Sequence, residues 1–511
     1  MASRDLAFDL ALRCDLTKGR LGLDQIGATE VGVAIAGEWL IGNGSGGMAH
    51  GEWLTGRCDT RTRPAAPRAI PNANGRVGFL RWERVRGVLS PQDYAVGFLE
   101  RREHRRGGIP RETWQSTAEE VRLGAEPFSE LCRKVVLCIT EDWFALSHFK
   151  PLIAVLREVA RSVVVVTRSS GRLGEIEALG ARVIDFDFRR ASSHPLREAQ
   201  SAWALARVLE AEDPDVVHLV AMKPVVLGGL ALKLMPAAHV IAHMTGLGLL
   251  AFGHGQLLRL YRGAALRLMA SMLRRPSSFL LVENPDDLAL LRAGGVDPGP
   301  RFTILGGAGV DAEAFPALPQ PRNAVPVAAF VGRMIRPKGV DVLVAALDRL
   351  KQRAVPIHLE LYGDTDADNP EAVPGAELSA WCAKGDARWF GHVADVREVW
   401  RHADIFVLPA RSREGMPRAL LEAAASARAL VVTDVPGCRH FVRDGVEGFV
   451  VPAEDPGALA TALERLARDA DLRRRMGEAA RLRLLQGFTE EHVKQSLRAT
   501  YAAMLRDSRV S

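Results

Sequence analysis

Short runs of apolar residues recur along the chain from residue 133 onward and predict buried β-strands. The runs are continuous rather than alternating, as expected of strands covered on both faces of a parallel sheet. Helical patterns separate them, for example over 151–160 and 202–210, so the chain reads as a succession of βαβ units. The first series of runs comprises 135–139, 163–166, 183–186, 216–220, 240–242, 279–282 and 302–305, and the second comprises 327–331, 358–361, 405–408 and 430–433.

A proline-rich link over 315–326 divides the two series. The sequence therefore predicts an α/β protein with two doubly wound, Rossmann-like domains, the first over 133–316 and the second over 317–487. We expect a C-terminal helix over 488–511 to pack back on the first domain. Ligands of open α/β sheets bind beyond the carboxyl ends of the strands, so a central cleft between the two domains is the expected site.

Residues 1–132 differ from the rest of the chain in composition and in hydrophobic pattern. They hold a glycine-rich patch at 42–47, a Pro/Arg stretch at 61–71 and an Arg/Glu-rich run at 100–111, but no apolar period long enough to build a core. This pattern favours a poorly defined extension, or sequence translated upstream of the true start, over a small accessory domain.

The composition of the 511 residues, 48% hydrophobic and 25% charged, is that of an ordinary globular protein. No uncharged apolar stretch reaches the length of about 18 residues that a membrane-spanning helix needs, and the first residues do not resemble a signal peptide. Six cysteines without a Cys-x-x-Cys pair argue against a disulfide framework or a zinc ribbon. We therefore expect a reduced, cytoplasmic protein.

The formal net charge of +6, carried mainly by arginine, favours an anionic partner. Nucleic acid is the least favoured of these, because the chain has no long Lys/Arg run and only 6% aromatic residues. Anionic lipid and phosphorylated substrates remain as the favoured classes of anionic partner.

The second series of runs opens with a strand, the pair Gly332-Arg333, and then Lys338-Gly339 at the start of a predicted helix over 340–353. Such a turn suits a diphosphate, since the helix start offers free N–H groups and the two cations neutralise phosphate charge. Alone, the same residues are equally consistent with a solvated basic turn. The spacing is not that of a P-loop.

Two carboxylates, Glu414 and Glu422, flank a second predicted helix start at Pro417. Carboxylates beside free N–H groups can bind sugar hydroxyls and help to hold a phosphate. The alternative is that Glu414 only complements the helix dipole and that Glu422 is a surface residue.

Together these motifs resemble the retaining family-4 glycosyltransferases of GT-B fold, over about residues 133–508. The resemblance depends on the Gly-Arg…Lys-Gly turn, on the Glu-x7-Glu pair, and on Gly309-Val310-Asp311…Phe315, in their usual order. The first-domain strings Asp185-Phe186-Asp187-Phe188 and Thr245-Gly246-Leu247-Gly248 look like those of bacterial members that extend lipid-linked surface polysaccharides.

The resemblance implies a role for each matching residue. Gly332, Arg333 and Lys338 would hold the nucleotide diphosphate. Glu414 would bind hydroxyls of the donor sugar, and Glu422 would bind the ribose. The remaining implied donor contacts are Gly415, Met416 and Pro417 around Glu414, and the backbone near His392 and Val393 for the base.

In the first domain, His243 matches the position of a donor-sugar contact near the anomeric carbon; the alternative is a hydrogen-bonded core histidine at a strand end. The catalytic set is then His243, Glu414, Arg333 and Lys338. Trp143 and His148, after the first strand, and Thr245 and Gly246 are acceptor-side candidates, although Trp143 is equally suited to covering the core.

The implied activity is transfer of a hexose or N-acetylhexosamine from a nucleotide sugar, UDP-linked, to a lipid-linked saccharide, with retention of configuration. The cations would stabilise the leaving diphosphate, so no metal or other cofactor is expected. The Asp-x-Asp strings at Asp185–Asp187 and over 364–368 are weak metal candidates, because acids often fill such loops. The alternatives are a sugar-nucleotide epimerase of similar fold and a non-catalytic sugar-nucleotide-binding protein.

Residues 256–275 predict a basic amphipathic helix, with an apolar stripe through Leu257, Tyr261, Ala264, Leu268 and Met272 beside several arginines. Such a helix can rest on the inner, anionic face of a plasma membrane. The alternative is a domain helix with its stripe in the core and its arginines in water.

Overall fold

The computed structural model describes residues 38–41, 54–57, 132–188, 195–233, 238–246, 256–366, 369–385, 387–411 and 414–507. The chain divides into two units, Met1–Pro110 and Arg111–Ser511. In the first, strands β1 (Glu38–Ile41) and β2 (Leu54–Arg57) pair antiparallel. The rest of the predicted extension up to residue 131 lies outside the described residues.

The first sheet of the larger unit has seven parallel strands in the order β5-β4-β3-β6-β7-β8-β9. Every apolar run predicted in this region falls on one of these strands. The central residues of β3, β4, β6, β7 and β8 are buried because helices cover both faces, as the continuous runs predicted, whereas the edge strands β5 and β9 are exposed or half-buried. The strands are β3 (Lys134–Glu141), β4 (Ser162–Arg168), β5 (Arg182–Asp185), β6 (Val216–Val220), β7 (His239–Met244), β8 (Ser278–Val282) and β9 (Phe302–Ile304).

Two separate hydrophobic cores lie on the two faces of this sheet. One face packs against α7 (Pro195–Glu212), α8 (Met222–Ala231), α9 (Gln256–Leu273) and α10 (Pro285–Ala293). The other packs against α4 (Asp142–His148), α5 (Lys150–Val159), α6 (Leu173–Ala178) and the last helix, α18 (Glu490–Asp507).

The second sheet has six parallel strands in the order β12-β11-β10-β13-β14-β15. Strands β12 and β15 were not predicted. In β12, at the sheet edge, the exposed Arg388 interrupts the apolar run, whereas β15 was missed although its residues Phe449–Val451 are consecutive and apolar. The strands are β10 (Val327–Val331), β11 (His358–Tyr362), β12 (Ala387–Gly391), β13 (Ile405–Leu408), β14 (Ala429–Thr433) and β15 (Gly448–Val451); the helices are α11 (Val340–Gln352), α12 (Gly375–Cys382), α13 (Val396–His402), α14 (Arg418–Ala425), α15 (Pro436–Phe441), α16 (Pro456–Arg468) and α17 (Ala470–Leu485).

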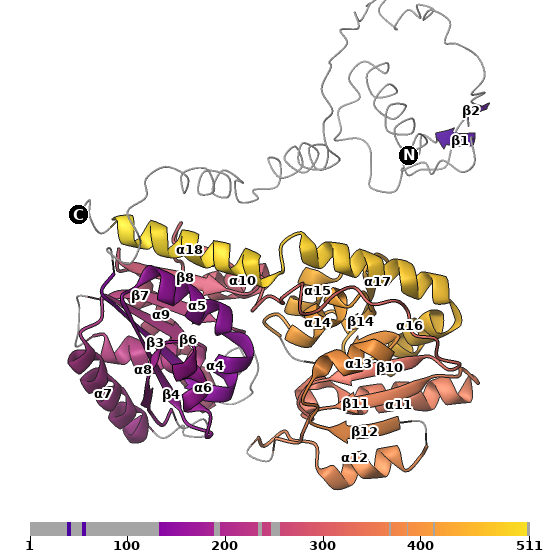
Figure 1. Ribbon diagram of the computed structural model, residues 1–511, viewed down its shortest axis with the longest axis horizontal. Helices are drawn as coiled ribbons and strands as arrows, with labels where there is room; N and C mark the ends of the chain where they lie inside the picture. The colour runs from indigo at the N-terminus through magenta and orange to yellow at the C-terminus, as the bar shows by residue number, and fades with distance from the viewer. Residues whose placement is uncertain are drawn as a thin grey trace, which may run out of the picture. The chain divides into compact units, whose positions relative to one another are not determined.

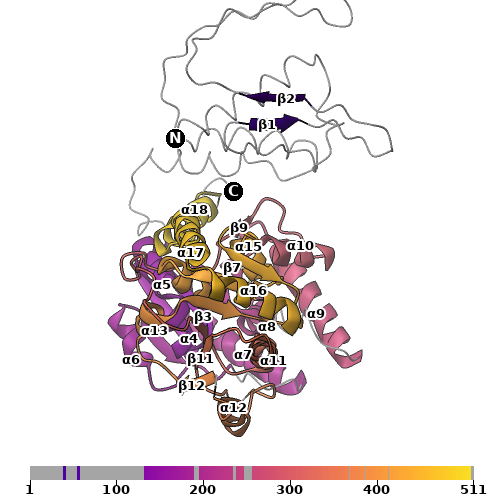
Figure 2. The same cartoon turned by 90° about the vertical axis from the view of Figure 1, so that its right-hand side faces the viewer.

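The chain crosses between the two domains twice, and the two crossings are bonded to each other. The backbone N–H of Val310 donates to the Phe488 carbonyl (3.3 Å), and the N–H of Glu490 donates to the Val310 carbonyl (3.0 Å). Beyond this point α18 lies along the first domain (Figures 1 and 2), where Arg498 forms an ion pair with Glu158 of α5 at 2.7 Å. The last helix is therefore part of the first domain's core.

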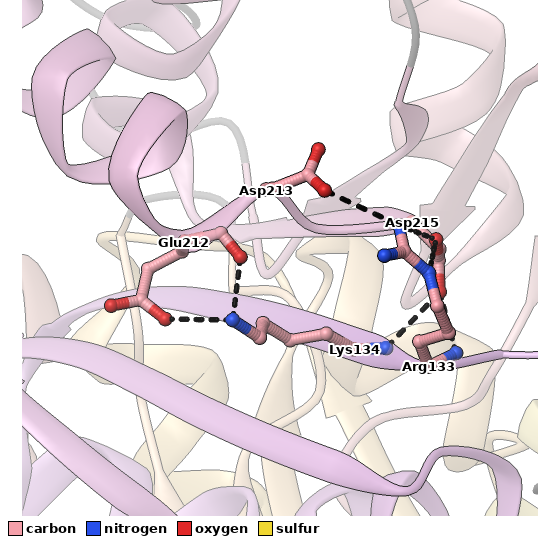
Figure 3. Close-up of polar contacts among 5 residues, drawn as sticks. All are labelled: Arg133, Lys134, Glu212, Asp213 and Asp215. Atoms are coloured by element: carbon pink, nitrogen blue, oxygen red, sulfur yellow. Dashed lines mark hydrogen bonds and ion pairs between the residues drawn. The ribbon is translucent and has the colours of Figure 1, made fainter.

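A polar cluster fixes the amino ends of β3 and β6 (Figure 3). The Asp215 carboxylate accepts hydrogen bonds from the Arg133 side chain (2.8 and 3.0 Å) and from the Lys134 backbone N–H (3.1 Å). Lys134 Nζ donates to the Glu212 carbonyl (2.6 Å). Because strands of a parallel sheet point the same way, this cluster lies at the edge opposite the carboxyl ends.

Helix α9 forms as predicted, but its predicted apolar stripe is wrong in part. Ala264 is exposed, whereas Ala265, Met269 and Met272 are buried in the core. The helix is therefore rotated from the expected orientation, and Leu260 is left 70% exposed on its outer side.

Candidate active site

The carboxyl end of β10 continues into Gly332 and Arg333. The shape of this turn is determined by its close approach to the backbone at the end of β11. The Gly332 N–H donates to the Tyr362 carbonyl (2.9 Å). Gly363, with φ +134°, lies so close that a Cβ there would clash with the Gly332 carbonyl oxygen. Arg333 leaves this turn with its side chain 47% exposed and paired with Asp366 at 2.6 Å.

A short 3₁₀ turn, Arg336–Lys338, carries the second cation to the start of α11. It ends at Gly339, whose φ of +75° belongs to the left-handed region, and a Cβ there would clash with the Pro409 carbonyl. Lys338 Nζ forms an ion pair with the Glu414 carboxylate at 2.9 Å. Their side chains are only 18% and 17% exposed, so the two predicted motifs meet in one partly desolvated pair.

The loop from Glu414 to Pro417 is held by the first domain. The Met416 N–H donates to the Glu283 carboxylate (2.7 Å), and Asn284 Nδ2 donates to the Gly415 carbonyl (3.0 Å). A Cβ on Gly415 would clash with both Glu283 and the Thr245 carbonyl. Only glycine fits there, and the position of Glu414 depends on residues far away in the sequence.

Glu422 lies within α14 and is buried. The alternative prediction that Glu422 is a surface residue is therefore wrong. Arg418 Nε donates to its carboxylate at 2.8 Å. Burial raises the pKa of Glu422, and the charge of Arg418 opposes that rise. Arg418 also donates to the Ser147 carbonyl of the first domain, so α14 begins with a cation shared by both domains.

The candidates for reading the base, His392 and Val393, follow β12 directly. The His392 N–H donates to Asp364 (2.9 Å), and the neighbouring Asp366 pairs with Arg333. Both acids are thus engaged within the second domain, and residue 368 lies outside the described residues. In the other string, Asp185 is exposed and accepts from the Ser169 N–H (3.1 Å). Among the described residues no group of three or more His, Cys, Asp or Glu is placed to hold a metal ion.

Across from these cations, the first domain presents His243, His148 and Glu283 around a small pocket. His243 is the penultimate residue of β7 and is 4% exposed; His148 ends α4, with Nδ1 2.7 Å from Ser147 Oγ. The pKa of His148 is lowered to about 3, first by burial and then by the charges of Arg418, Lys338 and Arg333. The positive potential of the second domain therefore reaches this pocket.

Glu283 is the acidic group of the same pocket. Burial raises its pKa to about 8, while the hydrogen bond from the Met416 N–H acts in the opposite direction. At neutral pH this carboxyl is mainly protonated and adds little negative charge to the pocket.

The other acceptor-side candidates are not among the residues that line this pocket. Thr245 contacts Gly415 through its carbonyl, and Gly246 has φ +121°. Trp143 is half-buried beside Phe144, with ring centroids 5.8 Å apart, and does not line the pocket. Leu247 and Gly248 lie outside the described residues.

Sequence reasoning missed three residues of the site: Glu283, Asn284 and Arg418. Asn284 caps α10 through the Asp287 N–H, and a pattern of Asn-Pro after an apolar run predicts such a cap. That pattern marks a helix start but says nothing of the bond to Gly415. Arg418 lies within the Glu-x7-Glu motif, but the spacing of the motif does not predict its hydrogen bonds to Glu422 and to the Ser147 carbonyl.

Two family models match the chain. One, described as glycosyl transferases group 1, matches residues 325–469, and the other, glycosyl transferase 4-like, matches residues 134–275. The match over 325–469 covers all six strands of the second sheet, and the match over 134–275 covers β3 to β7 of the first sheet. Residues 1–132 lie outside both matches.

Similar proteins are found both by sequence and by fold. The chain is 24% identical to N,N'-diacetylbacillosaminyl-diphospho-undecaprenol alpha-1,3-N-acetylgalactosaminyltransferase of Campylobacter jejuni, over 71% of this chain and 97% of that one. It is 25% identical to the capsular polysaccharide biosynthesis glycosyltransferase CapM of Staphylococcus aureus, over 36% and 47%. The crystal structure of Anabaena HepE in complex with UDP and glucose has a TM-score of 0.59 at 16% identity, over 73% and 100%.

Proposed function

Because the chain belongs to the family-4 glycosyltransferases of GT-B fold, we propose that it transfers a hexose or N-acetylhexosamine from a UDP-sugar to a lipid-linked saccharide. Its relatives place it in polysaccharide or lipid-linked saccharide synthesis. The diphospho-undecaprenol in the name of the Campylobacter relative supports the lipid-linked acceptor, and the UDP bound to HepE supports the nucleotide.

One observation carries the proposal: the Lys338–Glu414 ion pair, with Arg333 and Arg418 beside it, faces a pocket that contains His243. Cations at the start of a helix bind a diphosphate, and a carboxylate among them binds the hydroxyls of the attached sugar. When the donor binds, Lys338 exchanges part of its bond to Glu414 for phosphate oxygens. Glu414 is thereby freed to accept hydrogen bonds from the sugar.

In the transfer step, negative charge grows on the departing diphosphate, and Lys338 and Arg333 stabilise it. The cations take the part that a divalent metal plays elsewhere, so we propose that no metal is needed. The acceptor hydroxyl attacks from the side of the leaving group, which takes up its proton, and the configuration is retained. Glu422, bound to Arg418 in the structure, is the proposed ribose contact.

The test uses the purified full chain with UDP-, GDP- and ADP-sugars, with and without EDTA, and a lipid extract carrying lipid-linked saccharides as acceptor. We expect one UDP-sugar to be turned over only with the extract, at a rate that EDTA does not change. The Glu414→Gln variant is expected to lose this transfer, whereas Glu478→Gln, on the surface of α17, keeps it.

Three results would contradict the proposal. Epimerisation of the donor without an acceptor would indicate the epimerase. Binding of UDP-sugar without any turnover would indicate the sugar-nucleotide-binding protein. Transfer abolished by EDTA and restored by a divalent cation would show that the cations of the site are not sufficient.

Helix α9 is the proposed contact with an anionic membrane, where a lipid-linked acceptor would be found. It contains no acidic residue, and Arg259, Leu260 and Arg267 are exposed on it. An exposed leucine between arginines suits a shallow interfacial contact, to which each cation adds about 1 kcal/mol near an anionic surface. Within the described part of the chain, every helix is too short or too polar to cross a bilayer.

Vesicle sedimentation tests this contact. Replacing Arg259 and Arg267 by glutamate is expected to lower binding to phosphatidylglycerol vesicles, with no change for neutral phosphatidylcholine. The matched control replaces Arg465 and Arg468, on α16 of the second domain, by glutamate. Equal loss of binding in both double variants would mean that net charge, rather than α9, governs the association.

A further inference from the structure

Three polar side chains form a line of hydrogen bonds through the core of the first domain. The Tyr501 hydroxyl of α18 lies 2.8 Å from Nδ1 of His218 on β6. Nε2 of His218 lies 3.2 Å from Nδ1 of His243 on β7. All three side chains are buried, and the line ends at the pocket that His243 shares with His148 and Glu283.

Both histidines in this line are neutral at physiological pH. Burial lowers the pKa of His243 to about 3, and burial together with the neighbouring His243 lowers the pKa of His218 well below its usual value. A neutral imidazole has one donor nitrogen and one acceptor nitrogen. The protonation of one ring therefore determines that of the other.

The phenolic proton of Tyr501 sets the direction of the line. Among the described residues its hydroxyl has no hydrogen-bond partner other than His218, so donation to His218 Nδ1 is the arrangement that satisfies it. His218 then carries its proton on Nε2 and donates to Nδ1 of His243, which leaves the His243 proton on Nε2. The opposite direction would leave a buried phenolic O–H without an acceptor, which is costly.

We propose that Tyr501, acting through His218, holds His243 as the Nε2–H tautomer, so that His243 donates a hydrogen bond into the pocket. The edge of the Phe149 ring packs against the imidazole, with centroids 5.4 Å apart at 85°, and limits its rotation. The recipient of this bond, an oxygen of the transferred sugar or of the leaving phosphate, rests on the proposed function. Tyr501 and His218 are positioning residues, and the C-terminal helix is thus coupled to the site.

The test reads the tautomer directly. The full chain is labelled with ¹⁵N-histidine, and the resonances of His243 among the 13 histidines are identified by their loss in His243→Gln. In the wild type we expect a protonated Nε2 and an unprotonated Nδ1. In Tyr501→Phe, which keeps the ring but removes the hydroxyl, we expect a mixture of the two tautomers. Thr500→Val is the matched control, because Thr500 lies on the same helix and its hydroxyl bonds to Thr303 (2.9 Å) instead.

Kinetics give an independent reading. Tyr501→Phe is expected to lower kcat about tenfold with the KM for the donor unchanged, as for the loss of one oriented hydrogen bond, while Thr500→Val keeps both. A protonated Nδ1 on His243 of the wild type would overturn the proposal, and this measurement does not require the variant to fold. An unchanged tautomer in a folded Tyr501→Phe protein would overturn it as well. Since the spectrum needs no substrate, failure of the proposed function leaves this result readable.

Discussion

The two domains present opposite kinds of chemistry to the same site. The second domain contributes charged groups in ion pairs, Lys338 with Glu414 and Arg333 with Asp366, whose side chains keep some exposure to water. The first contributes neutral groups in a buried setting: His243, His148 and a mainly protonated Glu283. Both sets lie at the carboxyl ends of parallel strands, where open α/β sheets bind ligands.

This difference separates two tasks. A charged donor needs cations that can exchange one partner for another, and ion pairs that keep some contact with water exchange partners at a lower cost than fully buried pairs. Fixing one proton in place needs the opposite, a buried line of hydrogen bonds that cannot rearrange without leaving a polar group unsatisfied. The comparison predicts that substitutions of the charged residues in the second domain cause large losses of activity. Substitutions of the neutral, buried residues in the first domain should instead change how stability depends on pH.

The largest effect is expected from Lys338→Ala. Under the proposed function it removes a cation from the diphosphate and leaves the Glu414 carboxylate without its ion-pair partner, so kcat/KM for transfer should fall by about 10²- to 10³-fold. Lys384→Ala is the control, since Lys384 pairs with Asp348 on the surface of the same domain and should leave the rate unchanged. A loss of less than about threefold would remove Lys338 from the site.

A smaller loss is expected where the two domains touch. In Gly415→Ala the new methyl group would clash with Glu283 and the Thr245 carbonyl, so the loop that carries Glu414 has to move. We expect transfer to fall by about 10- to 100-fold and the free energy of unfolding by about 1–3 kcal/mol. Gly174→Ala, with no atom within 4 Å of the added carbon, should change neither. Wild-type rates in Gly415→Ala would mean that the loop position does not matter for transfer.

On the neutral side, Glu283→Gln should change the pH dependence of stability. The folded pKa of Glu283 is raised from 4.5 to about 8, so the folded state holds a proton that the unfolded state has released. Wild-type stability attributable to this group is complete below pH 4.5 and is lost as the pH rises to 8. Glutamine cannot ionise, so the melting temperature of the variant should rise relative to the wild type between pH 5 and pH 8. A constant difference over that range would show that Glu283 is ionised in the folded protein.

The sequence predicted the parts of this molecule that depend on local pattern. Eleven apolar runs were placed on strands, and the Gly332–Lys338 turn and the Glu414–Glu422 pair were identified because each motif occupies a few consecutive residues. Strand β12 was not predicted because one of its faces is exposed, which interrupts the apolar run.

Contacts between distant residues could not be predicted in this way. Glu283 reaches Met416 across 133 positions, and Tyr501 reaches His218 across 283. Neither pair lies in a repeated pattern, and each residue alone is consistent with several roles. The side of the site that depends on short motifs was therefore anticipated, whereas the residues that orient it became visible only in the fold.

The smallest effect is expected at the amino edge of the first sheet, which is not part of the site. Burial acts to raise the pKa of Asp215, but the hydrogen bonds from Arg133 and from the Lys134 backbone outweigh it and hold that pKa below its ordinary 3.8. Asp215→Asn should therefore lower the free energy of unfolding at pH 7 by about 1 kcal/mol, a modest figure because Arg133 is exposed to solvent.

The sign of the pH dependence is opposite to that of Glu283. The stabilising contribution of the Asp215 carboxylate is fully present above its ordinary pKa of 3.8 and is lost as the pH falls through the lower, folded value, so the wild type and Asp215→Asn should begin to converge only below pH 3.8. Transfer rates at pH 7 should be equal, because the cluster lies at the opposite end of the strands from the pocket. A loss of activity in a stably folded Asp215→Asn protein would mean that the two edges of the sheet are coupled, and the division of tasks between domains would then be incomplete.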